Sequence, residues 1–268
     1  MPASPSPNRA VNLTPRPRSY WLLVLIGLAA VVAVVIATLP ASVITRFLPP
    51  IVHAEDFSGS IWHGSAGKLT VAAHDAGALE WRLEPRSLLG LAVTAQLHWV
   101  KVGFVVDAAV KLDRHALSAH NLKGGGPIED LRDLGVAAGW RGMADIDFSQ
   151  LEWDFTKPLR VAGNIHVSNI TAAQVAGGAD LGSYDLRFGP SAVDAEGNVA
   201  ATLEDTGGPL RVQAVIQYSA KQRTALLTGT VQERPDIPAP LRSQIDGLAQ
   251  LRARDAQGRL PVDLEFRL

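Results

Sequence analysis

The chain has 268 residues, a formal net charge of −1 and no cysteine. The lack of cysteine excludes disulfides and thiolate metal sites, so any folded domain must be stabilised by its hydrophobic core alone. The charge balance argues against nucleic acid as a partner, because proteins that bind nucleic acid usually carry a basic patch.

The first 19 residues combine several prolines with polar side chains. A segment of this composition cannot bury enough apolar surface to fold. We therefore expect residues 1–19 to form a disordered tail.

An unbroken apolar run follows, from Tyr20 to Leu39. At about 1.5 Å per residue, a helix of this length covers the roughly 30 Å hydrocarbon core of a bilayer. Three arginines precede the run, and Tyr20 and Trp21 suit the headgroup boundary, which predicts a membrane helix with a cytoplasmic N-terminus. A cleavable signal peptide is the alternative, but its apolar region would be shorter and would end in small residues, so we favour an uncleaved anchor.

The part beyond the anchor is long enough for one sizeable exported domain. Prolines at positions 40, 49 and 50 indicate a short connecting segment. We expect residues 40–55 to be a linker and residues 56–268 to form the folded domain.

The exported part alternates between apolar and polar residues, as β-strands with one buried face do. From Val102 to Leu112 the even positions are all apolar, whereas Lys101 and Asp107 stand at odd positions. The same period of two recurs at 159–167, 184–188, 199–203, 210–218 and 260–268. One wet face and one buried face indicate antiparallel pairing, so we predict a mainly β fold with a mostly antiparallel sheet.

Two short helices are expected between strand blocks. Pro127 can begin the first, which Gly135 would end. The second starts near Pro240, where Leu241 and Ile245 begin a helical apolar repeat. Each helix should pack against an end or a face of the sheet.

A Trp-x-Gly element followed by Leu-Glu-Trp occurs twice in the exported part. The two copies contain Trp62, Gly64 and Trp81, and Trp140, Gly142 and Trp153. This recurrence is consistent with an internal duplication whose halves span about 56–134 and 135–268. Chance recurrence in a β protein that contains several tryptophans is an equally open explanation.

Two segments early in the exported part, GSIWHGSA at 59–66 and LEWRLEPRSLLG at 79–90, resemble the signature of the type II secretion system protein N family. That family combines such segments with one N-terminal membrane helix. The positions that carry the resemblance are Gly59, Trp62, Gly64, Trp81, Pro85, Leu88, Leu89 and Gly90, followed in order by Trp140, Gly142 and Trp153.

The resemblance implies a bitopic protein of the bacterial inner membrane with a periplasmic β-rich domain. It further implies an accessory role in the apparatus that exports folded periplasmic proteins across the outer membrane. The partners implied are other inner-membrane and periplasmic subunits of that apparatus. The family is not associated with an enzymatic reaction or a cofactor.

No motif in the sequence indicates catalysis or metal binding. Its histidines lack the i, i+4 spacing of the H-E-x-x-H motif, and Gly124–Gly126 lacks the lysine of a phosphate loop. Ser65 lacks the spacing of a nucleophile elbow. We expect no catalytic residue, metal or cofactor, and an exported hydrolase would require a cluster of catalytic side chains that only the fold could bring together.

The chief alternative to a secretion component is an anchored periplasmic protein that binds or transfers lipid. A curved sheet with an apolar inner face could hold acyl chains. This alternative requires that the inward residues are not packed into a closed core. Tryptophans of the exported part could likewise be interface anchors, but we favour a role in the core and at the rim of the sheet.

Overall fold

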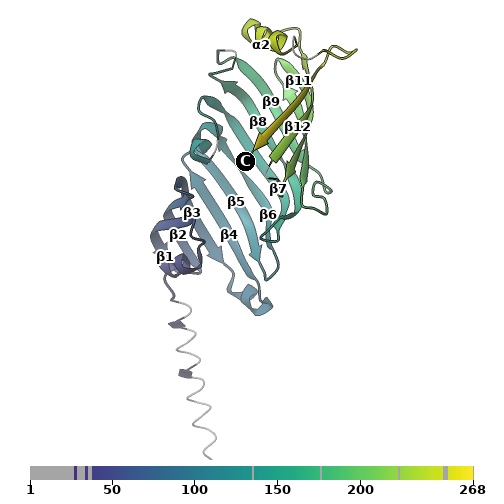
Figure 1. Cartoon of the computed structure of the whole chain (residues 1–268). Coiled ribbons are helices and arrows are strands. Elements are labelled where there is room, and N and C mark those ends of the chain that lie inside the picture. Colours follow the sequence, from purple (N-terminus) through teal and green to yellow (C-terminus); the bar gives the residue numbers. More distant parts are fainter. Residues whose placement is uncertain are drawn as a thin grey trace, which may run out of the picture. The chain divides into compact units, whose positions relative to one another are not determined.

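The structure, a computed structural model, contains one sheet of 13 strands (Figure 1). The residues that it describes are 27–28, 34–35, 38–134, 136–175, 177–222, 224–249 and 253–267. They belong to two units, Met1–Leu39 and Pro40–Leu268, and the sheet is in the second. Most of the predicted anchor, including Tyr20 and Trp21, lies outside the described residues. Within the described ranges, no helix has the length and apolar character needed to cross a bilayer.

Each strand pairs with the strand that follows it in the chain, so the order in the sheet is the order in the sequence. All of these pairs are antiparallel, which confirms the predicted mainly β fold. The strands are β1 (Val52–Gly59), β2 (His63–Val71), β3 (His74–Leu83), β4 (Val93–Lys101), β5 (Phe104–Leu112), β6 (Leu117–Pro127), β7 (Trp140–Trp153), β8 (Pro158–Ala172), β9 (Asp180–Phe188), β10 (Val199–Gly207), β11 (Leu210–Ser219), β12 (Thr224–Glu233) and β13 (Leu260–Arg267).

The register of the strands places apolar residues opposite one another across the whole sheet. One row, which we call the apolar row, takes one residue from every strand and contains no polar side chain. Its members are Phe57, Ala66, Leu79, Trp99, Val106, Gly124, Ile146, Ile165, Leu186, Leu203, Ala214, Gly229 and Val262.

The residues next to this row point to the opposite face, because successive side chains of a strand alternate between faces. They form a polar row in which Val215 is the sole apolar member. Its members are Ser58, Ser65, Glu80, His98, Asp107, Lys123, Asp147, Asn164, Arg187, Thr202, Val215, Thr228 and Asp263. The sheet therefore has one apolar face and one polar face.

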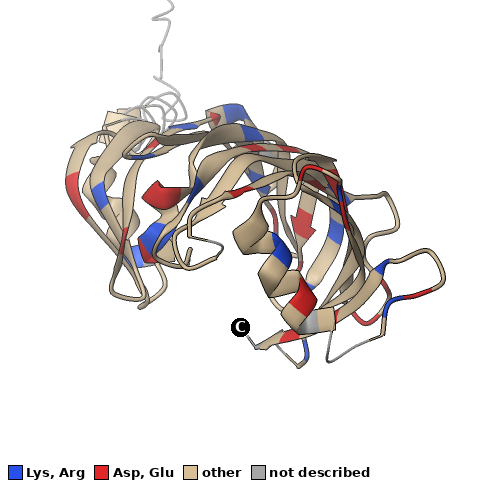
Figure 2. Cartoon of the chain, turned by 90° about the horizontal axis from the view of Figure 1, so that it is seen from above, with Lys and Arg blue, Asp and Glu red and all other residues tan. Residues whose placement is uncertain are grey.

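The sheet is strongly curved, and Figure 2 shows it bent into an arch. The helices η1 (Ala41–Phe47), η3 (Ile128–Leu134) and α2 (Ala239–Ala249) pack against the hollow side, which is the apolar face. The helix η2 (Pro85–Gly90) lies in the connection between β3 and β4. Both helices predicted from the sequence are present, although the one after Pro127 is a short 3-10 helix.

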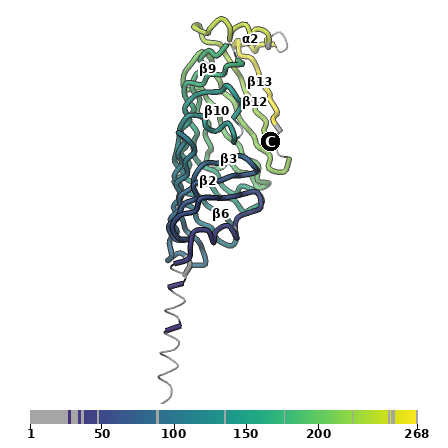
Figure 3. Tube along the Cα trace, turned by 90° about the vertical axis from the view of Figure 1, so that its left-hand side faces the viewer, coloured from purple at the N-terminus to yellow at the C-terminus, as the bar shows by residue number. Residues whose placement is uncertain are grey.

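Successive antiparallel connections alternate between the two ends of the sheet. α2 connects β12 to β13, and Figures 1 and 3 show it at one end, which we call the α2 end. Pro40 forms a β-bridge with Ser60 in the turn between β1 and β2, at the opposite end. We call this the Pro40 end. The apolar face thus has one end beside α2 and another where the folded unit begins.

Two core clusters lie in different parts of the sheet. At the α2 end, Leu241 and Ile245 of α2 pack with Ala172, Leu181 and Leu260, which come from β8, β9 and β13. The other cluster joins η1 to the first strands through Ala41, Ala66 and Trp81. Burial of Leu241 and Ile245 confirms the apolar side that the sequence predicted for the late helix.

The segment expected as a linker, 40–55, is instead part of the folded unit. It contains η1 and the first residues of β1. Ala41, the first residue of η1, is 1% exposed because it packs against Ala66 and Trp81. The prolines that indicated a connection mark the two ends of η1 and its passage into β1.

The prediction that a strand begins at Val102 was wrong, because β5 begins at Phe104. Val102 lies in the turn between β4 and β5, with φ of 53° and a side chain that is 82% exposed. Lys101, expected on the wet face, is 3% exposed. The turn changes the alternation here, because residues within a turn do not follow the period of the strands beside it.

Candidate functional site

The candidate site is the middle of the sheet's apolar face. Ile146, Ile165, Leu186 and Leu203 lie side by side there on β7 to β10. All four side chains are partly exposed, and among the described residues neither core cluster includes them. The helices thus cover parts of the apolar face near its ends and leave this central part without a packed second layer.

A neighbouring inward row is equally apolar and contains two aromatic rings. Phe148 and Phe188 flank Gly163 across β7, β8 and β9, with ring centroids 5.4 Å apart. On the later strands Ile216 and Leu227 continue the same face. The central apolar face is therefore at least two side-chain rows wide.

A small cavity of about 190 Å³ lies on this face near β1 to β4. Its wall is formed wholly by apolar residues: Ile44, Leu48, Ala54, Phe57, Ala66, Leu69, Leu79, Trp81, Leu83, Ala95 and Leu97. Residues from η1 form one side of the cavity and the sheet forms the other. It is a space suited to hydrocarbon and offers no polar side chain to a ligand.

Trp81 is the centre of the first sequence motif. Its ring is 8% exposed, its Nε1 donates to the carbonyl oxygen of Ile61 over 3.0 Å, and Phe57 meets it edge-on at 6.4 Å. Gly64 is its cross-strand partner. The favoured interpretation of this tryptophan as a core residue is confirmed.

The glycines of the motif allow that packing. A Cβ at position 64 would lie 2.6 Å from Cζ2 of Trp81, so only glycine admits the ring. Gly59 has φ of 79°, in the left-handed region, and ends β1 before the turn that carries Trp62. The motif thus shapes the Pro40 end of the apolar face.

The remaining motif positions are spread over the sheet. Pro85 and Gly90 begin and end η2, which connects β3 to β4, whereas the side chains of Leu88 and Leu89 lie outside the description. Trp140 packs against the α2 cluster, with Gly142 two residues further along β7. Trp153 ends the same strand at the Pro40 end. The structure therefore brings Gly59, Trp62, Gly64 and Trp81 together but not the later tryptophans.

The two copies of the proposed repeat occupy different settings. Gly64 and Trp81 face each other on adjacent strands, whereas Gly142 and Trp153 lie near opposite ends of the single strand β7. The duplication stays a prediction, and these positions are not structurally equivalent.

Comparison with known proteins identifies the family. The family model of type II secretion system (T2SS), protein N, matches residues 50–263. The chain belongs to this family. The resemblance seen in the sequence is thereby confirmed, and the chain is a component of a type II secretion system. No curated protein and no solved structure matches the chain.

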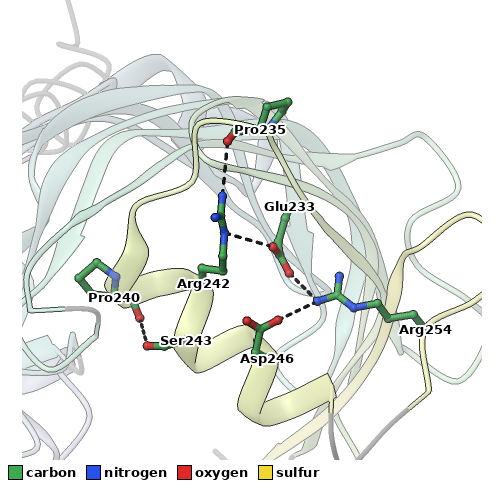
Figure 4. A network of polar contacts seen from close by, with 7 residues as sticks. All are labelled: Glu233, Pro235, Pro240, Arg242, Ser243, Asp246 and Arg254. Atoms are coloured by element: carbon green, nitrogen blue, oxygen red, sulfur yellow. Dashed lines mark hydrogen bonds and ion pairs between the residues drawn. The ribbon is translucent and has the colours of Figure 1, made fainter.

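In this protein N family member, a polar network fastens α2 to the sheet (Figure 4). Glu233, at the end of β12, accepts a hydrogen bond from Arg254, which follows α2, and it also pairs with Arg242 on α2 at 3.9 Å. Arg254 contacts Asp246 of α2 at 3.3 Å. One carboxylate thus ties together the chain segments before, within and after the helix.

A second polar network closes the α2 end near η3. The buried Lys101 ammonium lies 3.1 Å from Asp133 Oδ2 and also donates to the backbone carbonyl of Asp75. Asp130 of η3 accepts from the backbone N–H of Gly103 over 2.9 Å. These contacts hold η3 against β3, β4 and the turn that precedes β5. The alternation of the sequence had placed Lys101 on the solvent-exposed face, which was wrong.

The polar face carries two cross-strand His–Asp pairs that the sequence did not reveal. His98 lies 2.7 Å from Asp107 and His166 lies 2.5 Å from Asp185. Burial works against ionisation of Asp185, but hydrogen bonds from His166 and Arg187 outweigh it and lower the pKa of the carboxyl. Only the register between strands places these residues opposite each other, so no local sequence motif predicts the two pairs.

Tyr184 lies on the apolar face near the α2 end. Burial raises its pKa to about 12, and the nearby Asp205 carboxylate acts in the same direction. Its hydroxyl donates to the carbonyl of Leu181 over 2.6 Å. Asp205 in turn pairs with Arg234 and accepts from the N–H of Val212. These groups are engaged in holding the sheet to the segment that leads into α2.

No group of three or more His, Asp or Glu side chains with metal-binding geometry occurs in the described part of the chain. The pKa shifts above follow from burial for Tyr184 and from hydrogen bonds with His166 and Arg187 for Asp185. The candidate site is the partly exposed central part of the apolar face.

Proposed function

We propose that this protein is an accessory subunit of the type II secretion apparatus, anchored in the inner membrane by Tyr20–Leu39 with its N-terminus in the cytoplasm. The sheet unit would then lie in the periplasm and contact other subunits that export folded proteins across the outer membrane. The observation that carries the proposal is the family match over residues 50–263, which begins directly after the apolar run and the short helix η1.

The role proposed is structural, and no chemical reaction is assigned to it. The polar face of the sheet offers alternating charges for contact with other proteins, including Lys123, Asp147 and Arg187. Neighbouring genes that encode the secretion ATPase, pseudopilins and the outer-membrane channel are expected on the same grounds.

The anchor is tested by fractionating cells that produce the full chain and extracting the membranes with alkaline carbonate. We expect the wild type to stay in the membrane pellet and a variant with Val31→Arg and Val32→Arg to be released. Protease added to the periplasm should degrade the sheet unit and spare the N-terminal tail. A wild-type chain found in the soluble fraction would overturn the anchor.

The role in secretion is tested separately. Deletion of the gene is expected to lower export of a substrate of the apparatus, and the wild-type gene should restore it. A photo-crosslinker at Arg187 on the polar face should capture subunits of the apparatus. Unchanged export together with no captured subunit would overturn the proposed role.

A further inference from the structure

The central apolar face needs an occupant, because a continuous apolar surface left in water is unfavourable and marks an interaction site. Ile146, Ile165, Leu186 and Leu203 are partly exposed rather than packed. On β5 and β13 the exposure is higher at the Pro40 end, where three inward apolar side chains are exposed. These are Leu112, Leu264 and Phe266, at 41%, 48% and 48%.

The chemistry of the face restricts what can occupy it. Backbone groups of the inner strands are engaged with neighbouring strands, and the apolar row adds no polar side chain. An extended polypeptide laid across the face would bury its own N–H and C=O groups without partners, which is unfavourable. A helix pairs these groups internally, as α2 does on the same face, so a helical segment of another protein is the competing occupant. A hydrocarbon chain has no such groups and gains by leaving water.

The two ends of the face differ in a way that indicates direction. At the α2 end, α2 and η3 pack on the sheet and are fastened by the Glu233 and Lys101 networks. At the Pro40 end, the folded unit begins with Pro40 beside Ser60, immediately after the apolar run that ends at Leu39. Because no residue separates the run from Pro40, this end is the one that the chain keeps near a membrane if the run is an anchor.

We propose that the apolar face binds the acyl chains of a membrane lipid, which enter from the Pro40 end. The cavity between η1 and the sheet extends the same apolar lining over β1 to β4. The direction of entry rests on the proposed anchor, whereas the binding itself rests on the face alone. This adds a lipid-binding activity to a component of a protein-export apparatus.

The first test compares the two faces of β9 by photo-crosslinking in cells. Benzoylphenylalanine replaces Leu186 in one full-length protein and Arg187 in the other, and mass spectrometry identifies the adducts. Because Leu186 belongs to the apolar row and Arg187 to the polar row, lipid adducts are expected from position 186 and not from position 187. A protein captured at position 186 would overturn the proposal and identify a polypeptide as the occupant.

The second test uses purified full-length protein and vesicles of phosphatidylethanolamine and phosphatidylglycerol. The vesicles contain a phosphatidylcholine with a diazirine at the end of one acyl chain, and labelled peptides are mapped after irradiation. Ile216→Asn and Val215→Asn are matched variants, because they place the same amide on opposite faces of β11. Labelling of β7 to β10 should fall roughly fivefold or more in I216N, since an unpaired amide disfavours hydrocarbon contact, and stay within about twofold in V215N.

Circular dichroism and thermal unfolding show whether both variants keep the fold, and the crosslinking at positions 186 and 187 does not depend on them. Equal labelling of both faces, or labelling confined to residues 20–39, would overturn the proposal. Loss of the anchor alone would appear in the fractionation experiment and leave the labelling of purified protein intact. Failure of the two proposals is therefore distinguishable.

Discussion

Gly64 lies directly beneath the indole of Trp81, its cross-strand partner, and a Cβ at position 64 would come within 2.6 Å of both Cζ2 of Trp81 and the carbonyl oxygen of Ser60. The substitution Gly64→Ala therefore forces either the ring or the turn to move. We expect it to destabilise the protein by about 1–3 kcal/mol, as overpacking of a core does. Chemical denaturation followed by tryptophan fluorescence measures this change.

Gly90→Ala is the matched control. A Cβ at Gly90 meets no atom within 4 Å, although both glycines belong to the family motif. The free energy of unfolding should change by no more than about 0.5 kcal/mol. Equal effects of the two substitutions would contradict the packing argument.

The docking of α2 should depend far more on its apolar side chains than on its ion pairs. Leu241 is 4% exposed, so Leu241→Ala should lower stability by about 2–5 kcal/mol. Glu233→Gln weakens contacts to Arg242 and Arg254 that are partly solvated and should cost about 1 kcal/mol or less. Hydrogen exchange of residues 239–249 reports detachment of the helix, and faster exchange in E233Q than in L241A would contradict this order.

Substitutions of Lys101 and of its partner Asp133 should differ in their effect on the free energy of unfolding. Lys101 is 3% exposed, whereas the side chains of Asp75 and Asp133 are each 58% exposed. Asp133→Asn leaves a buried ammonium with a weaker partner and should destabilise the protein by about 1–3 kcal/mol. Lys101→Met removes the buried charge and leaves carboxylates that water can solvate, so its effect should be smaller. Urea denaturation of both variants tests the ranking, and the reverse order would contradict it.

The Asp185 carboxyl should contribute to the stability of the sheet in a pH-dependent way. Its pKa in the folded protein lies below the ordinary value of 3.8, so the folded state favours the ionised form. The contribution is fully present above that value and is lost as the pH falls through the lowered folded pKa.

Asp185→Asn should therefore be less stable than the wild type at pH 6, and the difference should shrink as the pH falls below about 4. Urea midpoints of both proteins across this range give the measurement. A difference that grew on acidification would show that the carboxyl is not stabilised by His166 and Arg187.

Local alternation predicted six of the 13 strands, because alternation is a property of consecutive residues. The stretches around Val161, Leu186 and Ile216 became β8, β9 and β11 with the expected inward positions. The same reasoning failed at Lys101 and Val102, since a tight turn interrupts the period there. It also failed at 40–55, because the burial of Ala41 depends on Ala66 and Trp81, which lie far along the chain.

The sequence by itself determined that this protein is a mainly β chain with an apolar N-terminal run. It also determined the ordered motifs of the protein N family. Composition, the period of alternation and the order of motifs can all be read along the chain without knowledge of which distant residues meet. Only the tertiary structure decided that Phe57 to Val262 line up as one apolar row across all 13 strands. It also decided that the middle of that row stays without a packed layer and that His98 and His166 meet their aspartates. These depend on strand register and sheet curvature, which arise from contacts between distant residues.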